Sequence, residues 1–234
     1  MSPSSATFDA IVVGGSYAGL SAALQLARAR QRVLVVDAGQ RRNRFAAVSH
    51  GFFGQDGRDP AAIAAEARVQ LLKYPNVRWR QGEAVRAGGG SGAFRIGLDD
   101  GSAFDGRRVV LALGVHDELP RIDGLAERWG RSVFHCPYCH GYELEQGRIG
   151  VLASSAMALH QALMLPDWGR VTLFANAAFV PDPAQLAQLA ARGVELETGA
   201  VAAIERTATV VFADGRRRDM DGLFVASRTR PASA

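Results

Sequence analysis

The chain contains two cysteines, Cys136 and Cys139, and two residues separate them. Two thiols at this spacing can close a small disulfide ring and reopen it, so they form a candidate two-electron redox pair. His140 follows the second cysteine directly, and an imidazole there can take the proton from one sulfur and return it to a leaving thiol. We therefore predict that Cys136, Cys139 and His140 are catalytic. His135, which precedes the pair, stays undecided between a functional and a packing role.

Other chemistries use the same pattern of residues. Cys-Pro-Tyr-Cys is typical of glutaredoxin-like thiol exchangers, and Cys-x-x-Cys-His also matches the attachment motif of c-type haem, which needs an exported protein. A structural zinc site needs four ligands, usually in two separated pairs, and no second Cys/His pair follows residue 140, so we predict no metal. A pair of inert buried thiols is the plainest alternative, but two lone cysteines seldom fall at this spacing beside proline and histidine.

Composition limits the class of protein. The 234 residues, 48% of them hydrophobic, are enough for one large domain or two small ones. The net charge is +4, but the arginines are scattered and no aromatic residues interleave them, so we expect no nucleic-acid partner. Residues 1–7 do not resemble a secretion signal and no apolar run approaches a membrane span, so we expect no membrane partner and a cytoplasmic location. In the cytosol a pair of this kind is more often catalytic than structural.

A glycine-rich turn near the N-terminus predicts a dinucleotide site. Residues 8–13 form an apolar strand, residues 20–29 a helical pattern, and residues 32–36 a second strand that ends in an acid. Glycines at this strand–helix junction let the backbone approach a pyrophosphate, the helix N-terminus offers N–H groups to the phosphates, and the acid can accept hydrogen bonds from a ribose. The middle glycine of the usual fingerprint is replaced by serine. The predicted cofactor-binding residues here are Gly14, Gly15, Ser16, Tyr17, Ala18, Gly19 and Asp37.

The remaining pattern predicts two similar α/β units. After a long polar loop at 40–60, which bears an arginine cluster at 41–44, we expect a helix at 61–74, strands at 77–80, 93–98 and 102–104, a glycine-rich hairpin tip at 88–92, and a buried strand at 108–113. In the second half we expect strands at 132–135, 148–152, 171–174, 194–197, 201–205, 209–212 and 222–226, with helices at 155–165 and 183–191. His116 and His160 are expected to be structural.

Four motifs together resemble the thioredoxin-reductase-like flavoproteins, which are two-domain pyridine nucleotide-disulfide oxidoreductases. They are Gly-Gly-Ser-Tyr-Ala-Gly at 14–19, the loop with Asn43 and His50, Ala-Leu-Gly at 112–114, and Cys-Pro-Tyr-Cys-His-Gly-Tyr-Glu at 136–143. The resemblance covers essentially the whole chain. It implies an α/β fold of two Rossmann-like, three-layer (ββα/βαβ) units: an FAD-binding domain at 1–118, an NAD(P)-binding-like domain carrying the cysteines at 119–228, and the start of a return segment at 229–234.

The resemblance also implies a function. The chain would be an FAD-dependent thiol–disulfide oxidoreductase, with Cys139 facing the flavin and Cys136 exchanging with the substrate disulfide. Thioredoxin reductases proper have an acid where this chain has His140, and that variant also resembles the dithiol oxidases. FAD is the expected cofactor, a homodimer the expected assembly, and a thioredoxin-like protein or a small dithiol or disulfide the expected partner. Further residues complete the predicted cofactor-binding set: Gln40, Asn43, His50, Val85 and Gly114.

Three departures from the family pattern bear on this interpretation. The turn of the second βαβ unit, residues 153–158, lacks glycine, and the next strand ends at 174–177 without the basic cluster that holds the NADPH phosphate, which argues against NADPH. The chain also stops at Ala234, where the family continues into a final FAD-domain segment. We therefore expect a chain truncated at its C-terminus that holds FAD weakly or not at all by itself, and a stoichiometric flavin spectrum of the purified chain would refute that expectation.

The direction of electron flow stays open from sequence. A reductase would take hydride from a reduced nicotinamide and reduce a thioredoxin-like partner, whereas an oxidase would take electrons from a small dithiol and pass them to oxygen. A redox regulatory module that has lost turnover is a third alternative. A stand-alone thiol exchanger is the least favoured, because the cysteines follow a dinucleotide-binding unit.

Overall fold

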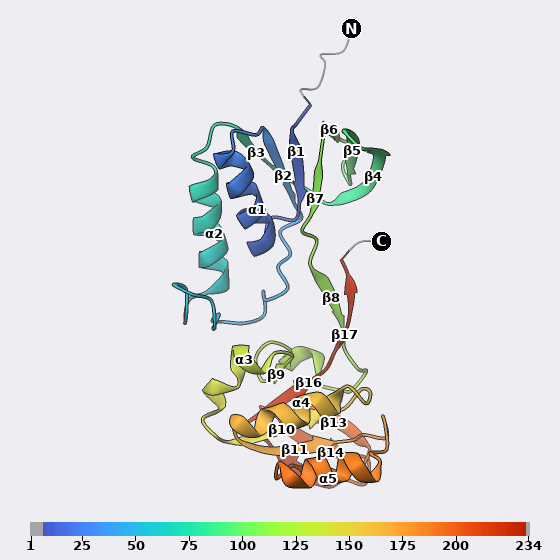
Figure 1. Ribbon diagram of the computed structural model, residues 1–234. Coiled ribbons are helices and arrows are strands. Elements are labelled where there is room, and N and C mark those ends of the chain that lie inside the picture. Colours follow the sequence, from blue (N-terminus) through green and yellow to red (C-terminus); the bar gives the residue numbers. More distant parts are fainter. Residues whose placement is uncertain (1–6, 233–234) are drawn as a thin grey trace. The chain divides into compact units, whose positions relative to one another are not determined.

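The computed structural model describes residues 7–232, which fall into two compact units (Figure 1). Unit 1 comprises residues 7–44, 59–116 and 231–232, and unit 2 comprises Phe45–Arg58 and Asp117–Arg230. Residues 1–6, and the last two residues of the expected return segment at 229–234, lie outside the described range. The sequence-based division put residues 45–58 and 117–118 in the first unit and residues 229–230 in the return segment, whereas all of these group with unit 2. Within unit 2, His50 of the segment 45–58 pairs with Glu143.

Unit 1 is built on a parallel sheet with the strand order β3-β2-β1-β7. Its strands are β1 (Ala10–Val13), β2 (Val33–Asp37), β3 (Val77–Gln81) and β7 (Val109–Leu111). Helices α1 (Tyr17–Arg28) and α2 (Pro60–Leu71) contribute to one core cluster. An antiparallel layer of β4 (Ala84–Gly90), β5 (Ala93–Leu98) and β6 (Ala103–Gly106) contributes to the other. Because both faces of the sheet are covered, the inner strands β1 and β2 are nearly continuous apolar runs, whereas the edge strand β3 alternates.

Unit 2 repeats this design. Its parallel sheet has the order β12-β11-β10-β16-β9, formed by β9 (Val133–Phe134), β10 (Arg148–Leu152), β11 (Arg170–Phe174), β12 (Glu195–Glu197) and β16 (Gly222–Val225). Helices α4 (Ala158–Met164) and α5 (Pro183–Ala191) supply one core cluster. The antiparallel strands β13 (Val201–Glu205), β14 (Thr209–Phe212) and β15 (Arg217–Asp219) supply the other. Two further strands pair where the chain passes between the units, β8 (Val115–Glu118) and β17 (Arg228–Pro231).

This architecture confirms the predicted α/β fold with two Rossmann-like units. The local differences have physical reasons. Gly88–Gly90 were predicted as a hairpin tip but continue strand β4, because they pair in register with β5, and the turn is confined to Ser91 and Gly92. Helix α4 begins at Ala158 rather than 155, because residues 154–157 form the turn that leaves strand β10. The short strands β8, β15 and β17 were not predicted.

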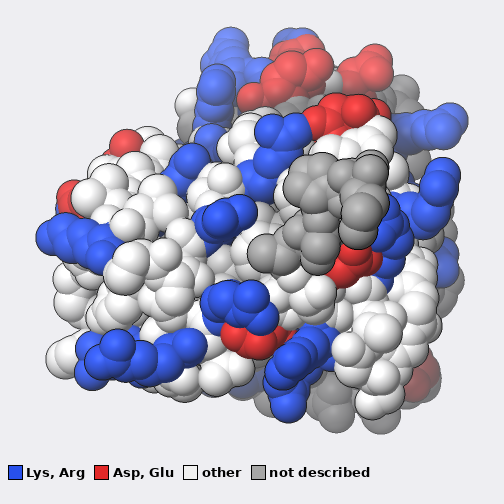
Figure 2. Space-filling model, turned by 90° about the horizontal axis from the view of Figure 1, so that it is seen from above, with Lys and Arg blue, Asp and Glu red and all other residues white. Residues whose placement is uncertain are grey.

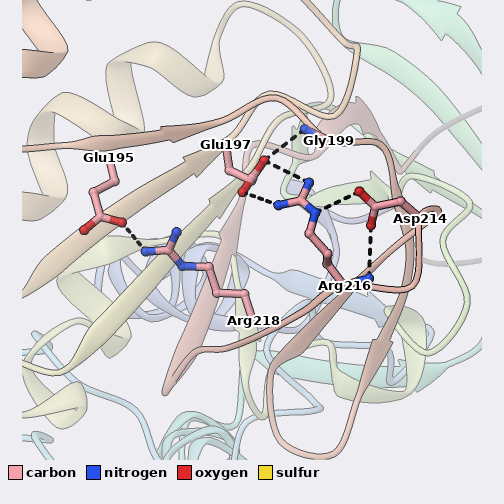
Figure 3. A network of polar contacts seen from close by, with 6 residues as sticks. All are labelled: Glu195, Glu197, Gly199, Asp214, Arg216 and Arg218. Carbon is pink, nitrogen blue, oxygen red and sulfur yellow. Dashed lines mark hydrogen bonds and ion pairs between the residues drawn. The ribbon is translucent and has the colours of Figure 1, made fainter.

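Ion pairs attach the antiparallel layer of unit 2 to the edge strand β12 (Figure 3). Arg216 pairs with Glu197 at 3.0 Å and with Asp214 at 2.8 Å, and its guanidinium lies over the ring of Phe212. Arg218 pairs with Glu195. The hydrogen bonds from Arg216 hold the pKa of Glu197 below its usual value. The arginine cluster at 216–218 therefore has structural partners.

The surface carries mixed charge. On the face shown in Figure 2, basic side chains are spread between acidic and uncharged ones and do not form one continuous tract. No helix among residues 7–232 has both the length and the apolar character that crossing a membrane requires.

Candidate functional site

The turn between β1 and α1 fits the steric demands of a dinucleotide cradle. Gly14 has φ +107°, and a Cβ atom there would lie 2.1 Å from the carbonyl oxygen of Ala112. Gly15 faces Asp37, and a Cβ there would lie 2.5 Å from the carboxyl carbon. The backbone N–H of Gly15 donates to Asp37 Oδ1 at 3.1 Å. Helix α1 packs closely on the turn at Gly19, where an added Cβ would lie 1.8 Å from the carbonyl oxygen of Gly14. Close contacts therefore require glycine at positions 14, 15 and 19, and the approach of a pyrophosphate to this turn stays a prediction.

Two adjoining cavities open at this turn in unit 1. The smaller, about 140 Å³, reaches from the turn along the ends of β1 and β2, and the larger, about 670 Å³, extends past the start of helix α1. A cavity of several hundred Å³ is the size of a cofactor site. Among the predicted residues, Gly14, Gly15, Ser16, Asp37 and Gln40 line the smaller cavity. Ser16, Tyr17, Ala18, Gln40 and Gly114 line the larger one.

The loop after β2 supplies polar groups to the same place. Asn43 donates from Nδ2 to the hydroxyl of Tyr17 at 3.1 Å, and that hydroxyl donates to the carbonyl of Pro60 at 3.0 Å. Two buried atoms here, Asn43 Oδ1 and Arg41 Nε, have no hydrogen-bond partner among the described residues. Buried polar atoms are costly unless they are paired, so these two offer an acceptor and a donor to a bound group. Arg41 lines both cavities, and a cation there suits a phosphate.

Four predicted residues line neither cavity, namely Gly19, Asn43, His50 and Val85. Val85 lines neither cavity, and its side chain is 58% exposed, while its neighbours Glu83 and Ala84 line the smaller cavity. His50 belongs to unit 2 and also lines neither cavity. Conversely, His116 lines both cavities although it was expected to be structural. His116 could have been identified from its position shortly after Ala-Leu-Gly at 112–114, which follows strand β7. Ligands bind at the carboxyl ends of parallel strands.

The cysteine pair lies where β9 ends in unit 2. Cys136 is the N-cap of α3 (Pro137–His140), and the backbone N–H of Cys139 donates to the carbonyl of Cys136 at 3.3 Å. Both cysteines are half-buried. Gly141 closes the turn against Trp168, where a Cβ would lie 2.8 Å from the indole ring. Because α3 is a single turn, its dipole favours a thiolate only weakly, and more of the tuning falls to neighbouring side chains.

His140 packs against the core. Its ring stacks on Phe134 with centroids 4.2 Å apart and an interplanar angle of 25°. Burial lowers the pKa of His140 below its ordinary value of 6.5, the charge of Glu143 raises it, and His50 lowers it. In the structure burial favours the neutral ring, which is the form that accepts a proton.

A second ionic cluster attaches the loop at 45–58 to the cysteine segment. His50 Nε2 lies 3.4 Å from Glu143 Oε1, and His50 Nδ1 lies 3.5 Å from Asp56 Oδ1. Glu143 lies in η2 (Tyr142–Leu144), directly after the turn that carries the cysteines. His50, predicted as a cofactor ligand, therefore contacts the redox segment within unit 2.

Comparison with known proteins identifies the family. A family model described as pyridine nucleotide-disulphide oxidoreductase matches residues 8–234. The chain belongs to this family. Thioredoxin reductase tcpT of Claviceps purpurea is 41% identical over 177 residues, which are 72% of this chain and 55% of that protein. Thioredoxin reductase sirT of Leptosphaeria maculans is 30% identical over 249 residues, 95% of this chain and 74% of that protein. This chain thus spans about half the length of the Claviceps relative.

A solved structure gives the same result. The crystal structure of an oxidoreductase from Agrobacterium tumefaciens matches with a TM-score of 0.95 and 56% sequence identity, covering 98% of this chain and 78% of that one. Within the pyridine nucleotide-disulphide oxidoreductase family, the chain is therefore thioredoxin-reductase-like.

Hydrogen bonds at the strand ends show which turn of unit 2 corresponds to the glycine turn of unit 1. In unit 1 the N–H of Gly14 donates to the carbonyl of Val36, which precedes Asp37. In unit 2 the N–H of Ala153 donates to the carbonyl of Phe174 in the same way, so Ala175 takes the place of Asp37. Ala175 is 2% exposed, and the next residue, Asn176, accepts from the backbone of Val201. This strand end offers neither a carboxylate nor a cation to a ribose.

Proposed function

We propose that this chain is an FAD-dependent thiol–disulfide oxidoreductase that moves electron pairs between FAD, held by unit 1, and Cys136 and Cys139. The observation that carries the proposal is the cradle at Gly14, Gly15 and Asp37, with unpartnered buried polar atoms beside it, in a chain that also holds a Cys-x-x-Cys turn. When bound, FAD supplies a two-electron acceptor or donor for the cysteine pair.

The chain's own groups account for binding. The N-terminus of α1 and Arg41 would neutralise the pyrophosphate, and Asp37 would accept hydrogen bonds from the ribose hydroxyls. The side chain of Ser16, the N-cap of α1, makes no cap hydrogen bond within the described residues, so it does not compete for the N–H groups of the first turn.

The thiol chemistry is an exchange in two displacements. A substrate thiolate attacks Cys136 Sγ of the Cys136–Cys139 disulfide, forming a mixed disulfide and releasing the thiolate of Cys139. The second substrate thiol, after losing its proton, displaces Cys136, and the substrate leaves as a disulfide. Two protons leave the substrate in this direction, and neutral His140 is placed by sequence to accept one of them. The reverse sequence reduces a substrate disulfide. The substrate class is thus a thioredoxin-like protein or a small dithiol or disulfide.

The geometry of unit 2 favours the oxidase direction as the second candidate function. The residues at the ends of β10 and β11 do not fit NADPH, because Ala153 stands where unit 1 has Gly14, and Ala175 and Asn176 offer no cation to a ribose 2′-phosphate. We therefore derive no step through a nicotinamide. Electrons would then enter from a dithiol and leave to oxygen.

The test uses the full chain incubated with FAD. Peroxide formation from dithiothreitol in air measures the oxidase direction, and NADPH-driven reduction of an aromatic disulfide measures the reductase direction. We expect peroxide formation that requires both cysteines, so that Cys136→Ser and Cys139→Ser abolish it, and NADPH oxidation at background. NADPH-driven turnover would instead establish the reductase. Flavin binding without either activity would support a regulatory module. Weak binding is what the sequence predicts for this chain, so the result that would refute the proposal is no binding even at saturating added FAD.

A further inference from the structure

His135, whose role the sequence left undecided, is held by a part-buried series of hydrogen bonds in unit 2. The hydroxyl of Ser227 donates to Asp117 Oδ1 at 2.8 Å and lies 3.2 Å from His135 Nδ1. Ser227 is 8% exposed. Asp117 lies in β8 and Ser227 follows β16, so segments far apart in the sequence meet at the residue before Cys136.

The direction of these bonds fixes the tautomer of His135. A serine hydroxyl has a single proton, and Ser227 donates it to the carboxylate of Asp117. In the contact between Ser227 and His135, the ring must therefore be the donor, so Nδ1 carries a hydrogen. Nε2 is then the atom of the ring that gains or loses a proton. The ring of His135 is thus linked through the Ser227 hydroxyl to the carboxylate of Asp117.

The backbone of His135 is held as well. Gln161, on helix α4, donates from Nε2 to the carbonyl of His135 at 2.6 Å. Gln161 is 7% exposed, and its Oε1 atom has no partner among the described residues, so the amide is used for this one bond. His135 is thus fixed at its ring and at its carbonyl, immediately before the N-cap cysteine. A packing histidine would need neither a carboxylate-terminated chain nor a buried amide.

We propose that Asp117 and Ser227 are positioning residues that orient His135 as the Nδ1–H tautomer, and that His135 in turn favours the thiolate of Cys136. His135 would then serve Cys136 as His140 serves Cys139. The inference deepens the proposed function, but thiol reactivity can be measured without flavin, so the two can fail separately.

The experiment measures the alkylation rate of each cysteine by iodoacetamide at pH 7. Because the chain has two cysteines, Cys139→Ser leaves Cys136 as the single thiol, and Cys136→Ser leaves Cys139. Adding Ser227→Ala should slow alkylation of Cys136 by about three- to tenfold, the effect of one net hydrogen bond, and should leave Cys139 within twofold. Ser227→Thr, which keeps the hydroxyl, should restore the rate at Cys136.

A matched control tests whether any buried hydroxyl would do the same. Thr209 is buried in unit 2 and donates to Asp219 at 2.7 Å, the same type of bond away from the cysteines. Thr209→Val should leave both alkylation rates unchanged. His135→Phe, which keeps a ring without nitrogens, should slow Cys136 as Ser227→Ala does, and the two changes together should add nothing further, since the serine acts through the histidine.

Three results would overturn the proposal. They are an unchanged rate at Cys136 in both Ser227→Ala and His135→Phe, an equal fall at both cysteines, or the same fall in Thr209→Val. The His135→Phe variant keeps the test decisive if Ser227→Ala does not fold.

Discussion

Gly15 is the position at which the cofactor cradle is most easily perturbed. Its backbone is not in the left-handed region, so alanine there adds no backbone strain, only a methyl group. That methyl would lie 2.5 Å from both the carboxyl carbon of Asp37 and the indole of Trp79, well inside ordinary contact. Either Asp37 or the turn must shift, and the Gly15 N–H bond to Asp37, 3.1 Å long, is then lost.

The magnitude follows from two effects. Overpacking a well-filled site costs about 1–3 kcal/mol, and a hydrogen bond to a charged group contributes about 1.5–3 kcal/mol. Because the effects share one displacement, we expect Gly15→Ala to destabilise unit 1 by about 2–4 kcal/mol. We also expect it to weaken FAD binding by at least tenfold, since each factor of ten is about 1.4 kcal/mol.

The assay separates unit 1 from unit 2. The chain has three tryptophans, and Trp79 is the one in unit 1, so a Trp129→Phe/Trp168→Phe background reports unit 1 during urea unfolding. FAD affinity is measured by quenching of flavin fluorescence. Gly88→Ala is the matched control, because that glycine has no atom within 4 Å of an added Cβ, and it should change stability by less than about 0.5 kcal/mol. Equal stability and equal FAD affinity in Gly15→Ala and Gly88→Ala would refute the cradle.

Three other predictions concern single side chains. Asp37→Ala should weaken FAD binding by about 10- to 100-fold, the value of one charged hydrogen bond, and titrations that match the parent would contradict its ribose role. His140 has a pKa lowered by burial from 6.5, so the unfolded chain takes up this proton first and stability falls as the pH drops below 6.5. His140→Phe should flatten the fall below about pH 6.5, and an unchanged slope in urea unfolding would count against the burial argument. Arg216→Ala removes exposed ion pairs with Glu197 and Asp214 (Figure 3). The resulting small loss in Tm should vanish in 1 M NaCl, and a loss that persists in salt would show that packing on Phe212 dominates.

Much of the fold could be predicted because the hydrophobic pattern changes period at the right places. The apolar runs at β1, β2 and β10 are buried on both faces, which is why they stand out in the sequence. Helix α5 was predicted with its observed bounds, because Pro183 and the capping pair Asp182 and Gln185 mark its start. Strands β8 and β17 were missed because they are short, exposed and polar, and each is defined only by its pairing with the other.

Some residues of the candidate site could likewise be proposed from sequence, and others could not. Gly14, Gly15 and Asp37 were predictable because a tight turn followed by an acid has a fixed spacing in the sequence. The hydrogen bonds that link Asp117, Ser227 and His135 were not predictable from sequence. These residues are up to 110 positions apart, and only the fold brings them together. His50 was assigned to the cofactor for lack of this information, whereas its ion pair with Glu143 depends on how the loop at 45–58 packs in unit 2.

The most direct test of the central claim is anaerobic reduction of bound flavin by a dithiol. FAD-loaded chain is mixed with dithiothreitol and the flavin absorbance near 450 nm is followed against time. If the cysteines carry the electrons, the parent should bleach, whereas Cys139→Ser with the same FAD content should remain yellow. Bleaching of Cys139→Ser at the rate of the parent would show that electrons reach the flavin without the cysteine pair.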